Sequence, residues 1–122
     1  MDRRKKILIV DDEEGVRELL SSSLEPRGYE VSTAVDGKDA LKQVARSKPD
    51  LILLDVMMPN MDGWETLDWL RRHEKTHRIP VIMLTAKSDT EALFKSEERK
   101  VVDYFIKPIN LQELLTFVRR YI

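Results

Sequence analysis

Cysteine is absent from the 122 residues of this chain. Its absence excludes disulfide bonds, cysteine-ligated zinc and a cysteine nucleophile, and it is compatible with the reducing cytoplasm, where we expect the protein to act. Long hydrophobic runs are missing too. The apolar stretch behind the basic N-terminal residues, Ile7 to Val10, ends at two aspartates and is far too short for a secretory signal or a membrane span.

An excess of charge of one sign is also missing. The 21 basic and 22 acidic residues leave a formal net charge of −1, which provides no general attraction to nucleic acid or to an anionic membrane. We therefore expect no direct nucleic-acid partner and no membrane partner. The 42% of hydrophobic residues suffice for a packed core, and the length fits a single domain, 1–122, with no room for an output domain.

Short runs rich in branched apolar residues alternate with longer segments of helical period, which is typical of βαβ units around a parallel sheet. The predicted strands are Lys6 to Val10, Glu30 to Ala34, Leu51 to Leu54, Pro80 to Leu84 and Val102 to Ile106. The predicted helices are Glu14 to Glu25, Lys38 to Arg46, Gly63 to His73, Thr90 to Arg99 and Leu111 to Tyr121. The second strand is the most polar and therefore suits an edge of the sheet.

Turn and capping residues lie at the predicted helix boundaries. Asp36 and Asp62 precede the second and third helices and can cap them with a carboxylate, while Pro26 and Gly28 end the first helix. The apolar residues of the first helix fall on one stripe, which comprises Val16, Leu19, Leu20 and Leu24. We expect this stripe to face the sheet.

Polar residues follow four of the predicted strands, at the carboxyl ends where open parallel sheets bind ligands. They are Asp11 and Asp12 after the first strand, Asp55 after the third, Thr85 after the fourth, and Lys107 with Pro108 after the fifth. An aspartate doublet alone is as often a helix-capping turn as a functional site. Chance, however, rarely places such polar residues at the ends of four strands together. If the first and third strands are neighbours, three carboxylates converge on one pocket.

Three ionised carboxylates a few ångströms apart repel one another unless a cation lies among them. A site of oxygen ligands completed by waters and a phosphate suits Mg²⁺ better than Ca²⁺. Lys107 and Thr85 add a positive charge and a hydroxyl donor. These groups together suit a phosphoryl group whose phosphorus is attacked in line by an aspartate oxygen.

With these residues the chain resembles the receiver domains of response regulators in two-component signalling, a family with a flavodoxin-like fold. The resemblance covers essentially the whole chain. It rests on residues 7–13 (ILIVDDE), 49–55 (PDLILLD), 58–63 (MPNMDG), 80–86 (PVIMLTA) and 103–108 (DYFIKP). It implies a doubly wound α/β fold of five βα units, with five parallel strands in the order 2-1-3-4-5.

The resemblance implies that Asp55 accepts a phosphoryl group from a phosphohistidine on a sensor histidine kinase or a histidine phosphotransfer protein. Asp12 and Asp55 would bind Mg²⁺ directly, Asp11 through water, and Met57 through its main-chain carbonyl. Lys107 would pair with the phosphoryl oxygens. Such a domain is a signalling switch that catalyses its own phosphorylation and dephosphorylation, and it is not an enzyme acting on other substrates.

The resemblance further implies how the switch is read. Thr85 would move toward the phosphoryl group and Tyr104 would turn inward behind it, which alters the face formed by the fourth helix, fifth strand and fifth helix. A downstream protein target would read that face, because a phosphoryl group shifts an equilibrium that already exists. The peptide bond before Pro108 would be cis.

Two positions that tune the phosphoryl lifetime in this family carry unusual residues here. Met57, the second residue after the phosphoacceptor, is bulky and cannot position a water molecule. Lys87, the second residue after the threonine, has a side chain long enough to reach or shield the phosphoryl oxygens. We therefore predict slow self-dephosphorylation.

Other residues also depart from the family pattern. Arg99 and Lys100 stand where an alanine and a helix-ending glycine are usual, which predicts a frayed or displaced fourth helix unless lysine is simply tolerated there. Trp69 lies off the apolar stripe of the third helix and is predicted to be an exposed aromatic, a feature without function in most proteins but one that can serve a partner. His73 and His77 lack a third ligand and suit solvated surface better than a metal site.

Two alternative functions remain open. Haloacid-dehalogenase phosphohydrolases also attack phosphorus from an aspartate after a strand, but their general-acid aspartate would stand at Met57, and the chain is short for their core and cap. A receiver that binds its partner without phosphorylation is the second alternative, which the complete Asp, Asp, Asp, Thr and Lys set disfavours. The chain is expected to be a monomer or a weak homodimer, either a stand-alone regulator, a phosphorelay shuttle or part of a longer protein.

Overall fold

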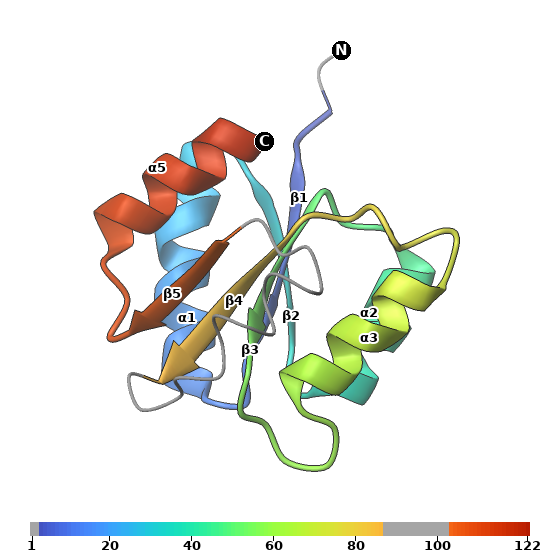
Figure 1. Cartoon of the computed structure of the whole chain (residues 1–122). Coiled ribbons are helices and arrows are strands. Elements are labelled where there is room, and N and C mark those ends of the chain that lie inside the picture. Colours follow the sequence, from blue (N-terminus) through green and yellow to red (C-terminus); the bar gives the residue numbers. More distant parts are fainter. Residues whose placement is uncertain (1–2, 87–102) are drawn as a thin grey trace.

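A single parallel sheet forms the centre of the protein in the computed structural model, which describes residues 3–86 and 103–122. Its strands are β1 (Lys6–Val10), β2 (Glu30–Ala34), β3 (Leu51–Asp55), β4 (Val81–Ala86) and β5 (Asp103–Lys107). They lie in the order β2-β1-β3-β4-β5 (Figure 1). The predicted α/β fold and strand order are therefore confirmed.

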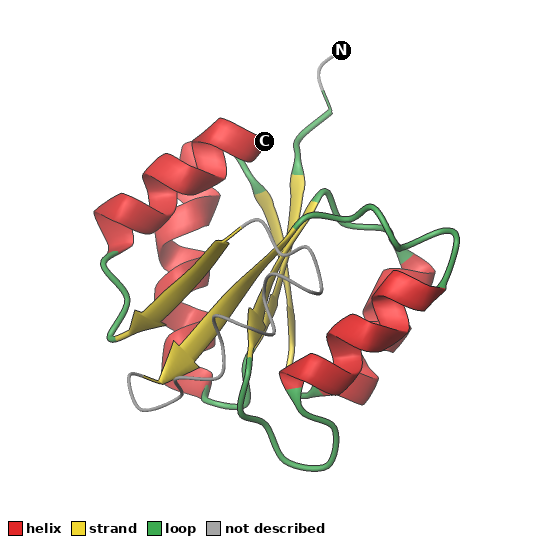
Figure 2. Cartoon of the chain, viewed as in Figure 1, coloured by secondary structure: helices red, strands yellow, loops and turns green. Residues whose placement is uncertain are grey.

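Helices cover both faces of this sheet, as Figure 2 shows. The helices are α1 (Glu14–Leu24), a short 3-10 turn η1 (Glu25–Arg27), α2 (Gly37–Arg46), α3 (Gly63–Arg72) and α5 (Leu111–Tyr121). The predicted fourth helix, Thr90 to Arg99, lies outside the described residues. So do Lys87 and Lys100, which flank it. Within the ranges the structure describes, none of the helices is both long enough and apolar enough to cross a bilayer.

The alternation of side chains along the strands builds two cores. In β1, Leu8 and Val10 pack toward α2 and α3, whereas Ile7 and Ile9 pack toward α1 and α5. All four side chains are at most 2% exposed. Burying each such side chain stabilises the fold by about 1.5–3 kcal/mol, so the central strands form a stiff support for whatever follows their carboxyl ends.

The edge position of β2 agrees with its composition. Its residues are mostly exposed, whereas every residue of β3 is buried. A strand covered by helices on both faces must be apolar at successive positions, while a strand at the edge tolerates polar residues. The prediction that residues 30–34 form an edge strand is confirmed.

The predicted capping residues act as expected. The Asp36 carboxylate accepts a hydrogen bond from the main-chain N–H of Asp39 at 2.8 Å, which caps α2. Asp62 accepts from the N–H of Glu65 at 2.9 Å, and Glu65 accepts from the N–H of Asp62 at 3.3 Å, which completes a capping box on α3. Gly28 follows η1 with a left-handed φ of 94°, a conformation that glycine adopts without strain.

Two predictions about helix faces are wrong. Leu19 is 51% exposed because the buried stripe of α1 runs through Val16, Leu20 and Leu24 at four-residue steps, and Leu19 lies to one side of it. Trp69 is not a lone exposed aromatic. It is half-buried against the core beneath α2 and α3, and its ring stacks on that of His73 with centroids 3.6 Å apart.

Candidate functional site

Three aspartates meet at the carboxyl ends of β1 and β3. The two strands are hydrogen-bonded neighbours with Val10 opposite Leu54, so Asp11 and Asp55 follow in the next row of the sheet. Oxygen atoms of Asp11, Asp12 and Asp55 all lie within 4.8 Å of one another. Asp11 is fully buried and Asp55 is 4% exposed, while Asp12 faces solvent.

Lys107, the last residue of β5, reaches across the sheet to these carboxylates. Its Nζ donates a hydrogen bond to Asp11 Oδ2 at 2.9 Å and lies 3.5 Å from Asp55 Oδ1. Glu13 Oε1 is 3.7 Å from the same ammonium. The bond from Lys107 to Pro108 is cis. One cation thus serves three acidic side chains, two of them buried.

The pKa values of the site reflect this imbalance of charge. Burial of Asp55, followed by the nearby Asp11 charge, raises the pKa of the Asp55 carboxyl from 3.8 to about 7, although Lys107 acts in the opposite direction. For Lys107, burial opposes the charged form, but the hydrogen bond to Asp11 and the charges of Asp55, Asp11 and Glu13 outweigh it and raise its pKa. The site therefore holds more negative charge than its lysine can neutralise.

We predict that Asp55 makes the metal-free protein less stable as pH rises. Because its pKa in the folded state is raised, the folded protein holds a proton that the unfolded chain releases, and the stabilising contribution present below pH 4 is lost on the way to about pH 7. Urea unfolding in EDTA at a series of pH values, compared with Asp55→Asn, isolates the effect. The free-energy advantage of the asparagine variant should grow between pH 4 and 7, and an advantage independent of pH would contradict the assignment.

The residues present fit a divalent cation. Asp11, Asp12 and Asp55 offer only hard oxygen ligands, which suit Mg²⁺. The raised pKa of Asp55 arises from burial and from the Asp11 charge, and both effects are relieved when a cation binds among the carboxylates. Asp12 faces solvent and leaves the site open to an incoming ion.

The other predicted site residues lie around this cluster. Thr85 is buried near the end of β4, where its hydroxyl donates to the main-chain oxygen of Ala86 at 3.3 Å. Tyr104 on β5 is half-buried against the core beneath α2 and α3. Met57 is 66% exposed, and its N–H donates to Asp55 Oδ1 at 3.3 Å. Lys87 lies outside the described residues.

Two residues contact the site without having been predicted to do so. Glu13 supplies a third carboxylate near Lys107 and a fourth to the site as a whole, and Arg17 donates from its guanidinium to the main-chain oxygen of Asp11 at 2.7 Å. Arg17 follows Asp11 by six residues, so α1 carries its side chain back over the loop that holds the aspartates. A basic residue one turn into a helix behind an acidic loop is the signal that could have indicated this contact.

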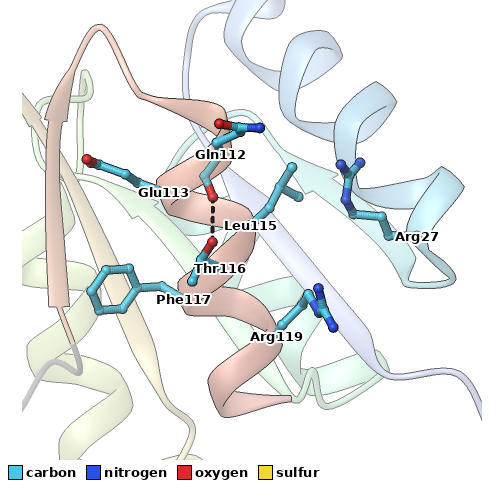
Figure 3. A pocket seen from close by; sticks show the side chains of 7 residues that line it. All are labelled: Arg27, Gln112, Glu113, Leu115, Thr116, Phe117 and Arg119. Carbon is cyan, nitrogen blue, oxygen red and sulfur yellow. Dashed lines mark hydrogen bonds between the residues drawn. The ribbon is translucent and has the colours of Figure 1, made fainter.

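The larger hollows in the described surface lie away from the carboxylates. One of about 520 Å³ lies between α5 and η1, where Leu115 is flanked by Arg27 and Arg119 (Figure 3). Another of about 500 Å³ lies between the carboxyl-terminal ends of α2 and α3. Neither of these two hollows is lined by an aspartate of the site, whose charged side chains suit a small ion or group.

Comparison with known proteins agrees with this geometry. The model of the response regulator receiver domain matches residues 7–119. The alkaline phosphatase synthesis transcriptional regulatory protein PhoP of Bacillus subtilis is 46% identical over 90% of this chain and 45% of its own length. The DNA-binding dual master transcriptional regulator RpaA of Synechocystis is 40% identical over 93% of this chain and 47% of its own.

A solved structure shows the same fold. The chemotaxis protein CheY4 of Vibrio cholerae superimposes with a TM-score of 0.91 at 32% identity, covering 98% of this chain and 100% of CheY4. The chain spans about half the length of the two curated relatives named above. Residues 7–119, which the family model matches, include the aspartates, the threonine and the lysine of the site. On its sequence, strand order and site, the chain belongs to the response regulator receiver domain family.

Proposed function

We propose that this domain accepts a phosphoryl group on Asp55 from a phosphohistidine and thereby switches a protein surface. One observation carries the proposal, namely the convergence of three carboxylates and Lys107 at the carboxyl ends of β1, β3 and β5. Asp55 is the central carboxylate, because it closes β3 in the middle of the sheet and its Oδ1 contacts the Met57 N–H and the Lys107 ammonium. A carboxylate oxygen there would attack phosphorus, and the donor histidine would leave with the electron pair of the broken P–N bond.

The proposed Mg²⁺ ligands are Asp12 and Asp55 directly, Asp11 through water, and the main-chain carbonyl of Met57. When bound, Mg²⁺ neutralises the phosphoryl oxygens and helps to align them for transfer. The protein's own part is distinct. Lys107 would supply a positive charge to the phosphoryl oxygens, and its ammonium and the Met57 N–H would position Asp55 Oδ1. In this proposal the domain itself catalyses both phosphorylation and dephosphorylation.

The proposed switch uses Thr85 and Tyr104. Phosphorylation adds a charge of about −1.5 to −2 and three acceptor oxygens at the end of β3. The Thr85 hydroxyl makes a long 3.3 Å bond to Ala86, which is readily exchanged for a phosphoryl oxygen. Tyr104 is half-buried against the core, and in this proposal it turns further inward when Thr85 moves. The altered surface would include β5 and α5.

The proposed partners are a sensor histidine kinase or a histidine phosphotransfer protein upstream and a protein target downstream, all in the cytoplasm. Among the relatives, RpaA is named a DNA-binding regulator and PhoP a transcriptional regulatory protein. Both are about twice as long as the matched region. For this chain, the lack of direct contact with nucleic acid stays a prediction, as does a monomeric or weakly dimeric state.

Beryllofluoride, which mimics a phosphoryl group on a carboxylate, tests the proposal. ¹⁹F NMR should show a bound signal that requires both Mg²⁺ and Asp55. In ¹H–¹⁵N spectra, the signals of main-chain amides near Thr85 and Tyr104 should shift at the beryllofluoride concentration at which the bound ¹⁹F signal appears. Asp55→Asn is the matched control and should show neither change. Binding without Mg²⁺, or equal binding by Asp55→Asn, would remove the basis of the proposal.

We further predict that Met57 prolongs the lifetime of the phosphoryl group. Its side chain is 66% exposed at the entry of the site and cannot orient a water molecule, because a thioether is only a weak acceptor. Met57→Asn should speed hydrolysis of the acyl phosphate by about tenfold, which corresponds to roughly 1.4 kcal/mol in the barrier. The rate of hydrolysis is measured by following the loss of the phosphoryl group from the protein in the presence of Mg²⁺. Met57→Leu, with a side chain of similar size, is the control. A half-life of seconds that Met57→Asn does not change would contradict the prediction.

A further inference from the structure

A groove lies at the end of the molecule opposite the aspartate site. It has a volume of about 500 Å³ and is formed by the carboxyl-terminal ends of α2 and α3 and the loops that follow them. We call it the basic groove and define it by Val44, Ala45, Lys48, Trp69, His73 and Lys75. No other segment of the described chain fills it.

The walls of the basic groove are apolar and firmly held. Val44 is buried, and Trp69 packs partly against the core while still lining the groove. His73 stacks on the indole at 3.6 Å, with the ring planes 19° apart, and its Nδ1 lies 2.6 Å from the main-chain oxygen of Trp69. A large aromatic side chain fixed in this way offers a wide contact surface and loses little conformational freedom when a partner binds.

The surroundings of the groove are strongly basic. Residues 42–50 and 71–78 carry three and four lysines or arginines, against two carboxylates, Asp50 and Glu74, of which Glu74 lines the groove. Residues 3–6 add four more, and Lys6 joins this end of α2 through a hydrogen bond from its Nζ to Ser47 Oγ at 2.8 Å. A chain with a net charge of −1 thus concentrates about half of its basic residues at one end.

Helix electrostatics explain only part of this charge. Basic residues are favourable in the last turn of a helix, which accounts for Arg46 in α2 and for Arg71 and Arg72 in α3. The effect fades beyond the last turn, so it does not account for Lys48 or Lys75, which lie after the helices and line the groove. Both lysines are exposed.

From this combination we propose that the basic groove docks an acidic segment of a partner protein that carries an aromatic or aliphatic side chain. The apolar side chain would enter between Trp69 and the end of α2, while carboxylates on either side would pair with Lys48 and Lys75. A nucleic acid fits less well, because phosphate contacts need basic residues but not an apolar groove. The surface lies far from Asp55, so docking is independent of the proposed phosphorylation.

Fluorescence anisotropy with short labelled peptides tests the proposal on the unphosphorylated protein. The probe is a peptide in which aspartates and glutamates flank one phenylalanine. It should bind saturably, more weakly at high salt, and more weakly when its phenylalanine is replaced by alanine. The double variant Lys48→Glu with Lys75→Glu should weaken binding by about tenfold or more. The matched control Lys38→Glu, at the other end of α2, should leave binding unchanged.

Trp69 itself is not replaced in this test, because its loss would also remove core packing. A second variant probes the groove without changing Trp69. Ala45 is exposed, so Ala45→Glu should fold normally, add a repulsive charge to the groove and weaken binding as well. The proposal is overturned by any of three results: no binding of the acidic peptide at low salt, equal binding of a peptide with lysines in place of the acids, or equal affinities for the groove variants and Lys38→Glu. Tighter binding of duplex DNA that the same variants abolish would assign the surface to nucleic acid instead.

Discussion

Gly63→Ala should lower the free energy of unfolding by about 2–3 kcal/mol, the upper part of the range of about 1–3 kcal/mol for forcing extra volume into a packed region. Gly63 is the first residue of α3, and its N–H donates to the main-chain oxygen of Val56 at 2.9 Å. A Cβ atom there would meet the main-chain oxygen of Asp55 and would lie 2.9 Å from the Val56 Cα. Main-chain atoms at the end of a buried strand cannot move aside, so either α3 or the Asp55 segment must shift.

The same substitution should therefore weaken Mg²⁺ binding, because the Asp55 carboxylate moves with its main chain. Urea unfolding measures the stability, and the gain in stability with added Mg²⁺ reports the affinity. Gly15→Ala is the matched control, since a Cβ on Gly15 in α1 would meet nothing within 4 Å. That variant should be unchanged or more stable by up to about 1 kcal/mol. Equal effects of the two substitutions would contradict the argument.

Lys107→Met should destabilise the metal-free protein at pH 8 by about 2–3 kcal/mol. Its ammonium is the hydrogen-bonded partner of the fully buried Asp11 and lies 3.5 Å from Asp55. Removing one member of a buried ion pair leaves the other charge without a partner. We place the effect below the range of about 3–5 kcal/mol for fully buried pairs because the Lys107 side chain is 22% exposed.

The pH and metal dependence of this loss distinguish charge from packing. Below pH 7 Asp55 takes up a proton, so the destabilisation should shrink toward pH 5. Saturating Mg²⁺ should also reduce it, since the ion replaces the missing positive charge. Lys107→Arg keeps the charge and serves as the control, with a smaller loss at every pH. Unfolding free energies that fall equally at pH 5 and pH 8, with or without Mg²⁺, would show that Lys107 acts through packing alone.

Much of the fold could be predicted because it depends on periodic patterns of apolar residues. The branched runs at residues 6–10 and 30–34 coincide with β1 and β2, and α5 has its predicted bounds. Strand-end residues were also predictable, because parallel strands bring their carboxyl ends to one edge of the sheet. Asp11, Asp55 and Lys107 are therefore close in space although they are far apart in the sequence.

The remaining features depend on side-chain directions, which the pattern of residue types leaves open. Leu19 and Leu20 are both apolar, but the rotation of α1 on the sheet buries only Leu20. The return of Arg17 to the Asp11 carbonyl and the stacking of His73 on Trp69 require particular rotamers. Such contacts follow from how a helix is placed on its neighbours, and that placement is set by the whole core.

Mass spectrometry after incubation with a small phosphoryl donor tests directly whether Asp55 accepts a phosphoryl group. We expect a single phosphoryl adduct, labile to hydroxylamine as an acyl phosphate is, on the proteolytic fragment that contains Asp55. The adduct should require Mg²⁺ and should be absent from Asp55→Asn. An adduct on another residue, or one that persists in Asp55→Asn or in EDTA, would contradict the account.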